Sequence, residues 1–254
     1  MNSSLILKIL EYCILFKIKR HFNLSPNQFG FRESTGTQAA TCLLKETILK
    51  YKNDNSPVFS CFLDLTKAFD RVNYEKLFGK LSVTSIPPCV IETLRNIYYH
   101  QFAYVSFNGQ KSDEFQIKNG VRQGGILSPL LFNFYINETI TKLCKSDYGC
   151  KLDFFPMNAI CYADDICLLA PSATGLQSLL NCLTSSLNNL NLKINENKTV
   201  CMVFTPTRGT LFNAARFFIN ATQLKMVKEQ TYLGMVLRSD LRSEEHTSEL
   251  QSLT

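Results

Sequence analysis

Two adjacent carboxylates, Asp164 and Asp165, are the residues of this sequence best suited to chemistry. They lie between two apolar runs, 157–161 and 166–170, a pattern that predicts two strands joined by a tight turn. A turn of this kind can hold both carboxylates toward a groove, and paired carboxylate oxygens are suitable ligands for a hard cation such as Mg²⁺. Asp is also common in solvated turns for backbone reasons, so the pair alone does not establish a metal site.

A second carboxylate, Asp64, ends the apolar, β-prone run over residues 58–63. A carboxylate that follows a buried strand lies at a sheet edge, where functional sites are often built; the alternative is a helix or turn cap. We expect Asp64 and Asp164 to converge on shared metal ions. Two ions would serve the attacking and leaving oxygens of an in-line displacement at phosphorus.

A glycine-rich stretch separates these two carboxylate sites. Gly124 and Gly125 permit close backbone approach to a ligand, although a structural turn before a core helix gives the same pattern. Ser128, followed by Pro129, predicts a helix start with Ser128 as the N-cap.

Together these stretches resemble the reverse transcriptase domain of a non-LTR (LINE-type) retrotransposon. The two catalytic motifs of that family are matched by residues 62–70 and by Tyr162-Ala163-Asp164-Asp165. The other matching segments follow the family's order and are residues 27–32 with Gly36-Thr37, 120–129, 192–199 and 232–234. The resemblance covers roughly residues 5 to 237.

The resemblance implies a role for each carboxylate. Asp64, Asp164 and Asp165 would bind two Mg²⁺ ions, or Mn²⁺ in their place, which activate the primer 3′-hydroxyl and neutralise the triphosphate leaving group. Lys198 would assist the departure of pyrophosphate; an exposed, salt-bridging lysine is the alternative. The implied partners are an RNA template, a DNA primer and dNTPs.

The resemblance also implies contacts to the nucleotide and the primer. Arg32 would grip the incoming triphosphate, as suits a guanidinium fork. Phe69 would lie under the sugar and exclude a 2′-hydroxyl, with ordinary core packing as the alternative. The remaining implied nucleotide-binding residues are Leu65, Gln123 and Gly124, and the implied primer grip is Tyr232, Leu233 and Gly234.

Composition is consistent with this interpretation. A chain of 254 residues, 45% hydrophobic with a net charge of +6, is large enough for a substantial core and suits a polyanionic partner. No apolar stretch reaches membrane-spanning length, because Lys8, Glu11 and Lys17 interrupt residues 5–18. The ten cysteines contain no Cys-x-x-Cys pair, so we expect free thiols in an intracellular protein. The resemblance implies that the protein acts in the nucleus and cytoplasm.

Periodicity predicts the elements that position these residues. Helices are expected over residues 5–22, 39–51 and 91–99, from about residue 73, from residue 128, and along a leucine stripe at 176–190. Strands are expected at 58–63, 157–161, 166–170, 199–204, 217–219 and 232–236, with a hairpin across Asn108-Gly109. We expect an α+β fold: a right-hand polymerase palm, with helices on one side of a mixed antiparallel sheet, plus partial helical fingers and no thumb.

The predicted organisation has three parts: partial fingers at 1–57, a palm with interleaved fingers elements at 58–237, and a polar tail at 238–254. The tail looks like translated read-through of a sequencing-library adapter. We expect the chain to be a fragment of a larger element. Two other functions stay open: an inactive or domesticated nucleic-acid-binding remnant, and an RNA-dependent RNA polymerase, which Phe69 disfavours. The sequence indicates no particular oligomeric state.

Overall fold

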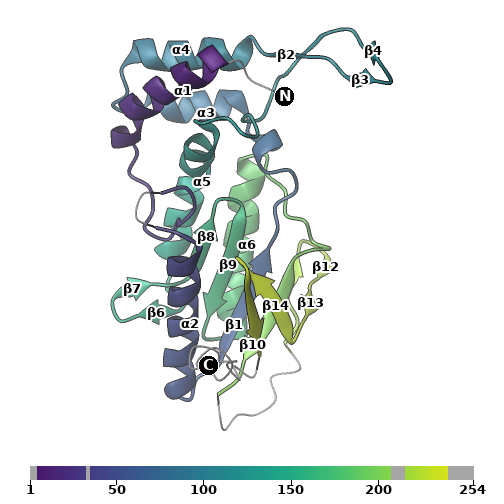
Figure 1. The fold of residues 1–254 in the computed structure, drawn as a ribbon. Coiled ribbons are helices and arrows are strands. Elements are labelled where there is room, and N and C mark those ends of the chain that lie inside the picture. The colour runs from purple at the N-terminus through teal and green to yellow at the C-terminus, as the bar shows by residue number, and fades with distance from the viewer. Residues whose placement is uncertain (1–4, 33–34, 207–214, 240–254) are drawn as a thin grey trace, which may run out of the picture.

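A five-stranded sheet forms the centre of the structure, a computed structural model that describes residues 5–32, 35–206 and 215–239 (Figure 1). Its strand order is β13-β10-β1-β9-β8. All neighbours in this sheet are antiparallel except β10 and β13, which are parallel. The strands are β1 (Val58–Leu63), β8 (Ala159–Tyr162), β9 (Asp165–Ala170), β10 (Val200–Phe204) and β13 (Lys225–Met226).

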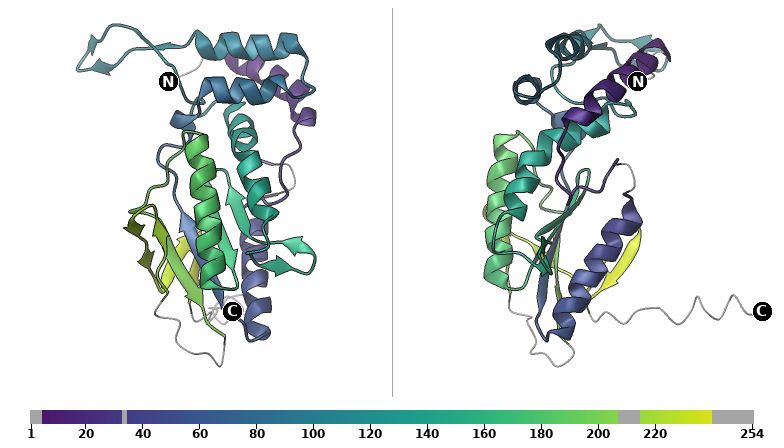
Figure 2. Two further views of the ribbon diagram at one scale, coloured as in Figure 1. Left: turned by 180° about the vertical axis from the view of Figure 1, so that it is seen from behind. Right: turned by 90° about the vertical axis from the view of Figure 1, so that its left-hand side faces the viewer.

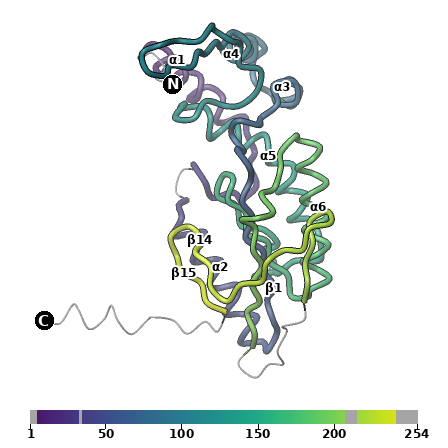
Figure 3. The backbone as a smooth tube through the Cα atoms, turned by 90° about the vertical axis from the view of Figure 1, so that its right-hand side faces the viewer, coloured from purple at the N-terminus to yellow at the C-terminus, as the bar shows by residue number. Residues whose placement is uncertain are grey.

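Secondary structure covers both faces of this sheet. Helices α5 (Ser128–Cys144) and α6 (Ala173–Asn189) lie on one face. Helix α2 (Thr37–Asn53) and the hairpin of β14 (Glu229–Tyr232) and β15 (Met235–Arg238) lie on the other (Figures 2 and 3). The prediction of helices on one side only is therefore wrong.

The burial of β1 explains why this arrangement is hard to see in the sequence. Every residue of β1 is buried. Phe59, Cys61 and Leu63 belong to the core cluster that contains the α5 and α6 residues, whereas Val58 and Phe62 belong to the cluster that contains α2. A strand that is buried on both faces is a continuous apolar run without polar alternation.

The leucine stripe of α6 is core, as predicted. Leu176, Leu179, Leu180 and Leu183 are fully buried, and the stripe faces β1, β9 and α5. Ser172 caps the helix, because its hydroxyl accepts a hydrogen bond from the Gly175 N–H at 3.0 Å. A serine N-cap satisfies one of the free amide groups of the first turn.

A layer of helices lies beyond the C-terminal end of strand β1 (Figure 1). It contains α1 (Leu5–Ile18), α3 (Tyr74–Ser82) and α4 (Pro88–Tyr99). A ribbon of two short ladders extends from it: β2 (Phe102–Ala103) with β5 (Phe115–Gln116), and β3 (Ser106–Phe107) with β4 (Gln110–Lys111). Strands β3 and β4 are joined by a turn at Asn108-Gly109, which confirms the predicted hairpin.

The remaining elements are short. They are the 3₁₀ turns η1 (Lys19–His21) and η2 (Phe69–Arg71), and the strand pairs β6 (Lys151–Leu152) with β7 (Phe155–Pro156) and β11 (Phe218–Ile219) with β12 (Thr222–Gln223).

Two local predictions are wrong. Ser128 does not cap α5: it is the first helical residue, Leu127 occupies the N-cap position, and no side chain makes the capping bond. Residues 232–236 do not form one strand, because Tyr232 pairs with Met235 across a turn at Leu233-Gly234. The backbone at Leu233 has φ 49°, which ends β14 and reverses the chain.

Three predictions concern the chain as a whole. All ten cysteines are free thiols, as expected. Among the described residues, no helix is long and apolar enough to cross a membrane. The predicted polar tail, 238–254, lies outside the described residues except for Arg238, which ends β15, and Ser239.

Candidate active site

Three carboxylates meet where β1 ends and β9 begins. The antiparallel pairing of these strands includes Leu63 opposite Ile166. The same register, continued by one residue, places Asp64 opposite Asp165. The structure thus brings together the two carboxylate sites predicted from the sequence. They lie at the end of the central strands that points toward the helical layer (Figure 1).

The turn between β8 and β9 presents the third carboxylate, Asp164. Tyr162 pairs with Asp165, so Ala163 and Asp164 form a two-residue turn. Ala163 is buried and has φ 54°, in the left-handed region that residues with a Cβ rarely adopt. Asp164 is half-buried and Asp165 is exposed. The fold therefore holds an unfavourable backbone conformation immediately before a predicted metal ligand.

The three carboxyl groups influence one another electrostatically. Burial, together with the negative charge of Asp64, raises the pKa of the Asp164 carboxyl above its ordinary value. Burial and the charges of Asp164 and Asp64 raise the pKa of Asp165. Like charges near one another disfavour further ionisation. A cation bound between the carboxylates would reverse this effect.

The donor chemistry of this cluster suits Mg²⁺. Within the described residues, no group of three or more His, Cys, Asp or Glu side chains forms a ready-made metal cage. Mg²⁺ is usually bound through one or two carboxylates together with water and substrate phosphates, so a closed cage is not required. Asp64 and Asp164, with Asp165 beside them, supply hard oxygen donors whose mutual repulsion a divalent ion would relieve.

Lys198 lies close to the same sheet edge. Asn195 donates its backbone N–H to the Asp64 carbonyl at 2.8 Å, and the Lys198 N–H donates to the Asn195 carbonyl at 3.1 Å. Lys198 is exposed and makes no ion pair with another described residue. Its position on a turn beside Asp64 is compatible with the predicted role toward the leaving group.

Leu65 and Phe69 follow Asp64 along the chain. Leu65 is buried and bridges Ile194, so only its backbone can face a nucleotide. Phe69 is half-buried, and its ring stacks on the buried ring of Phe132 with centroids 4.7 Å apart and planes at 13°. Stacking of this kind fixes the ring plane. Phe69 therefore does pack against the core, with part of its surface left accessible.

The loop before α5 carries Gln123 and Gly124, both exposed. The Gln123 side-chain amide donates to Asp70 Oδ1 at 3.2 Å. Gly124 has φ 77°, and a Cβ on it would meet no atom within 4 Å, so a ligand can approach this backbone. The loop reaches a cavity of about 680 Å³ that Asp70, Gln123 and Gly125 line. None of the three carboxylates is among the described residues that line the cavity.

Sequence reasoning missed what holds this loop. Glu11 of α1 is 2% exposed, accepts a hydrogen bond from the Ile126 N–H at 2.8 Å and lies 3.5 Å from Arg122 Nη1. The pair fastens α1 to the loop that presents Gln123. The signal in the sequence is a single carboxylate within an apolar helix, which by itself does not identify its partners.

Arg32 and Tyr232 of the predicted primer grip both donate hydrogen bonds to backbone carbonyls of the protein itself. Arg32 Nη1 donates to the backbone carbonyls of Ser25 at 2.7 Å and Gln28 at 3.2 Å, so part of its guanidinium serves the loop. The Tyr232 hydroxyl donates to the Ile160 carbonyl at 3.0 Å, which anchors hairpin β14–β15 on the sheet. Leu233 and Gly234 form the tip of that hairpin.

Several mobile-element polymerases are similar to this chain. It is 29% identical to the Retrovirus-related Pol polyprotein from type-2 retrotransposable element R2DM of Drosophila melanogaster, over 91% of the chain and 22% of that protein. It is 26% identical to the RNA-directed DNA polymerase from mobile element jockey of the same fly, over 88% of the chain and 24% of that protein. The chain thus spans less than a quarter of the length of these relatives.

Solved structures show the same fold. Apo telomerase from Candida tropicalis, truncated from its C-terminal domain, superposes with a TM-score of 0.55 at 16% identity, over 92% of this chain and 43% of that one. Telomerase from the same yeast, in complex with a TWJ fragment of telomeric RNA, gives a TM-score of 0.57 at 14% identity, over 92% and 35%. At such identities the likeness establishes the right-hand polymerase fold alone.

A family model extends over nearly the whole chain. The model described as Reverse transcriptase (RNA-dependent DNA polymerase) matches residues 2–237. This match and the mobile-element relatives confirm the predicted reverse transcriptase domain of non-LTR retrotransposon type. With its carboxylates gathered at one edge of a polymerase palm, the chain belongs to the reverse transcriptase family.

Proposed function

We propose that this chain carries the polymerase centre of a retrotransposon reverse transcriptase, which copies an RNA template into DNA by adding dNTPs to a primer 3′-hydroxyl. The observation that carries the proposal is the meeting of Asp64, Asp164 and Asp165 at one edge of the palm sheet. We further propose partial fingers at 1–57, a palm at 58–237, and action in the nucleus and cytoplasm.

The reaction is a displacement at phosphorus. The primer 3′-oxygen loses its proton and bonds to the α-phosphorus, and the bond to the β-phosphate oxygen breaks to release pyrophosphate. Asp64 and Asp164, with Asp165 beside them, would hold two Mg²⁺ ions, which supply Lewis-acid stabilisation of the attacking and leaving oxygens. Lys198, on the turn beside Asp64, would stabilise the negative charge of the departing pyrophosphate or donate a proton to it.

Substrate selection would depend on the surrounding residues. Phe69, fixed by its stack on Phe132, would fill the space that a ribose 2′-hydroxyl needs. Gln123 and the open backbone at Gly124 would contact the templating base or the nucleotide. The position of Phe69 favours DNA over RNA synthesis, and the presence of all three carboxylates favours an enzyme over an inert remnant.

Primer extension tests the proposal. We expect Asp64→Asn and Asp164→Asn each to lower dNTP incorporation on an RNA template at least 100-fold, since each removes an anionic donor from the metal site. The assay would use this chain and, in parallel, the longer polyprotein that contains it.

Asp153→Asn is the matched control. Asp153 is also an aspartate, but it lies away from the site. Its side chain is 82% exposed and pairs with Lys50 at 3.0 Å. Its substitution should leave incorporation within twofold of wild type. Residual activity within tenfold of wild type in either site variant would contradict the two-metal assignment.

A further inference from the structure

Gln28 grips the backbone of the turn that carries Asp164. Its side chain is buried, with the residue 1% exposed. Gln28 Oε1 accepts a hydrogen bond from the Ala163 N–H at 2.9 Å, and Gln28 Nε2 donates to the Ala163 carbonyl at 3.4 Å. One side-chain amide therefore engages both polar backbone groups of the residue that precedes the metal-site carboxylate.

This grip acts on the peptide plane that leads into Asp164. The Ala163 carbonyl belongs to the same planar unit as the Asp164 N–H, so rotation of that plane would move the Asp164 Cα and its carboxylate. Ala163 has φ 54°, a conformation that a residue with a Cβ adopts only where its surroundings impose it. The two hydrogen bonds between Gln28 and the Ala163 backbone oppose relaxation of this residue, in addition to the pairing of Tyr162 with Asp165 across the turn.

The segment that carries Gln28 is itself firmly held. Phe29 donates its N–H to the Cys161 carbonyl at 2.8 Å, and the Cys161 N–H donates to the Asn27 carbonyl at 2.9 Å, so residues 27–29 extend the sheet beside β8. The Asn133 side chain in α5 donates to the Gly30 carbonyl at 2.7 Å. Gln28 therefore connects a fixed edge segment to the turn.

Gly30 makes the close approach possible. A Cβ on Gly30 would lie 2.5 Å from the Ala163 backbone nitrogen, which no real Cβ tolerates. The Gly30 N–H also donates to Gln28 Oε1 at 3.0 Å, which fixes the orientation of the amide. Sequence and structure thus place a glycine and a glutamine together against one turn.

We propose that Gln28 is a positioning residue that sets the direction of the Asp164 carboxylate and thereby tunes divalent-metal affinity at the polymerase centre. The inference rests on the proposed function for the metal-binding role of Asp164. The hydrogen bonds printed for the Gln28 side chain join it to the backbone of Ala163 and Gly30, so it acts on Asp164 through the turn. It deepens the proposed site by identifying the residue that orients one of its ligands.

The test measures metal binding without catalysis. Mn²⁺ binding to the purified chain, followed by loss of the free-ion electron paramagnetic resonance signal, needs neither primer nor dNTP. We expect Gln28→Met, which removes the side-chain hydrogen bonds to Ala163 and Gly30 at similar volume, to raise the apparent Kd for Mn²⁺ about 10-fold. Amide hydrogen exchange at Ala163 should be faster in the same variant.

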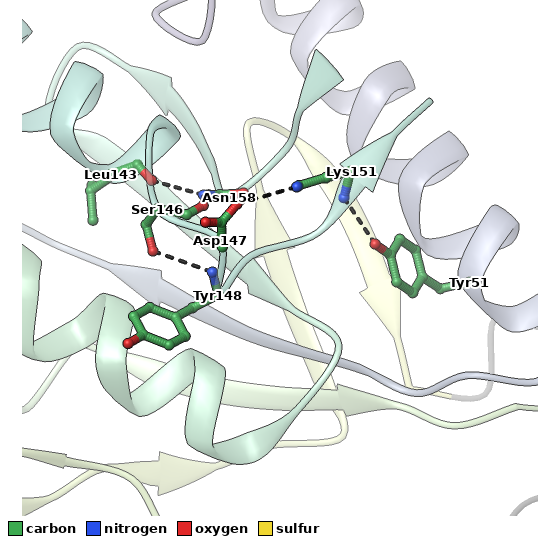
Figure 4. Close-up of polar contacts among 7 residues, drawn as sticks. All are labelled: Tyr51, Leu143, Ser146, Asp147, Tyr148, Lys151 and Asn158. Atoms are coloured by element: carbon green, nitrogen blue, oxygen red, sulfur yellow. Dashed lines mark hydrogen bonds and ion pairs between the residues drawn. The ribbon is translucent and has the colours of Figure 1, made fainter. Parts of the chain in front are cut away.

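Asn158→Leu is the matched control. Asn158 is a fully buried amide just before β8, at the opposite end of that strand from Asp164. Its side chain donates to the Leu143 carbonyl at 2.8 Å and to the Ser146 carbonyl at 2.6 Å (Figure 4). We expect its loss to lower the melting temperature while Mn²⁺ affinity stays within twofold of wild type.

A second variant covers the case in which Gln28→Met does not fold. Gln28→Asn keeps a neutral amide but is one methylene shorter, so it loses its reach to the Ala163 backbone without adding a charge beside Asp164. We expect it to fold and to bind Mn²⁺ with altered affinity, at least threefold from wild type.

Unchanged Mn²⁺ affinity in the folded Gln28 variants, with normal binding by wild type, would overturn the positioning role alone. Absence of Mn²⁺ binding by the wild-type chain would contradict the proposed function, and the positioning role with it.

Discussion

At the scale of the single residue, Asp164 is a carboxylate that the fold holds at some cost to its own stability. Burial and the nearby Asp64 raise its pKa, so its charged form is disfavoured relative to the unfolded chain. Groups assembled for metal binding commonly carry such a cost. The same interaction that weakens the metal-free fold would favour capture of a cation.

We expect Asp164→Asn to stabilise the metal-free chain at pH 7. The gain should be on the order of 0.5 kcal/mol, because solvent screens a half-exposed group. The pKa of Asp164 is higher in the folded than in the unfolded chain. The protonated carboxyl therefore carries no penalty below about pH 4, and the fold loses free energy of unfolding as pH rises through the raised pKa. The gain from Asn should therefore be present at pH 7 and vanish toward pH 4.

Urea unfolding in the presence of a chelator at the two pH values measures this difference. Asp153→Asn, which removes an exposed ion pair with Lys50, serves as the comparison and should bring no gain. An equal gain from Asp164→Asn at both pH values would show that the carboxylate charge is not the cause.

A substitution at Phe69 can distinguish selection of the nucleotide sugar from core packing. We expect Phe69→Val to raise incorporation of ribonucleotides relative to deoxynucleotides by at least tenfold, since the smaller side chain frees the space of a 2′-hydroxyl. Stability should also fall by about 1 kcal/mol or more with loss of the stack on Phe132. Competing rNTP and dNTP incorporation on one RNA template is the measurement.

The control for Phe69 is Phe78→Val. Phe78 is 1% exposed in α3 and packs near Tyr98 and Tyr99, so its loss affects the core. Discrimination between the two sugars should stay unchanged in that variant. Unchanged discrimination in Phe69→Val would assign Phe69 to core packing alone.

At the scale of the element, periodicity predicted most helices and strands, because one apolar stripe or run defines each of them. The leucines of α6 and the run of β1 are examples. The second covering layer was not predicted, since a strand buried on both faces reads the same whichever elements cover it. The turn at Leu233-Gly234 was missed because the apolar residues on either side resemble one short strand.

The candidate site was predictable for a similar reason. Asp64, Asp164 and Asp165 each follow from a strand end or turn, and antiparallel pairing brings them together. The supporting contacts of Gln28 and Glu11 were not predictable, because each joins segments more than a hundred residues apart in the chain. Periodicity describes which face an element buries and does not identify its distant partners.

The buried Glu11 gives a prediction for α1. We expect Glu11→Ala to destabilise the fold by about 3 kcal/mol, because it leaves the Ile126 N–H without its acceptor and Arg122 without its counter-ion. Glu92→Ala should cost less than about 1 kcal/mol, since Glu92 forms an exposed pair with Arg95. Urea unfolding compares the two, and equal costs would contradict a structural role for the Glu11 contacts.

At the scale of the whole molecule, the net charge and the local charge of the site serve different steps, namely nucleic-acid binding and metal-dependent chemistry. The chain carries a net charge of +6, while the end of the sheet that holds Asp64, Asp164 and Asp165 is locally acidic. Long-range attraction of a nucleic acid would therefore come from basic residues elsewhere on the surface, and the acidic edge would depend on divalent ions to accept the triphosphate. Binding and chemistry should consequently respond to different substitutions and different salts.

We expect the chain to bind an RNA–DNA hybrid with strong salt dependence, measured by fluorescence anisotropy without divalent ions. Neutralising only two phosphates predicts about a tenfold loss of affinity between 50 and 200 mM salt. Asp164→Asn should bind the hybrid as tightly as wild type or slightly tighter, since it removes a negative charge, while its extension activity is expected to fall at least 100-fold. Salt-independent binding would exclude a phosphate-dominated interface. Loss of hybrid binding in Asp164→Asn would mean that the acidic edge contributes to holding the duplex as well as to chemistry.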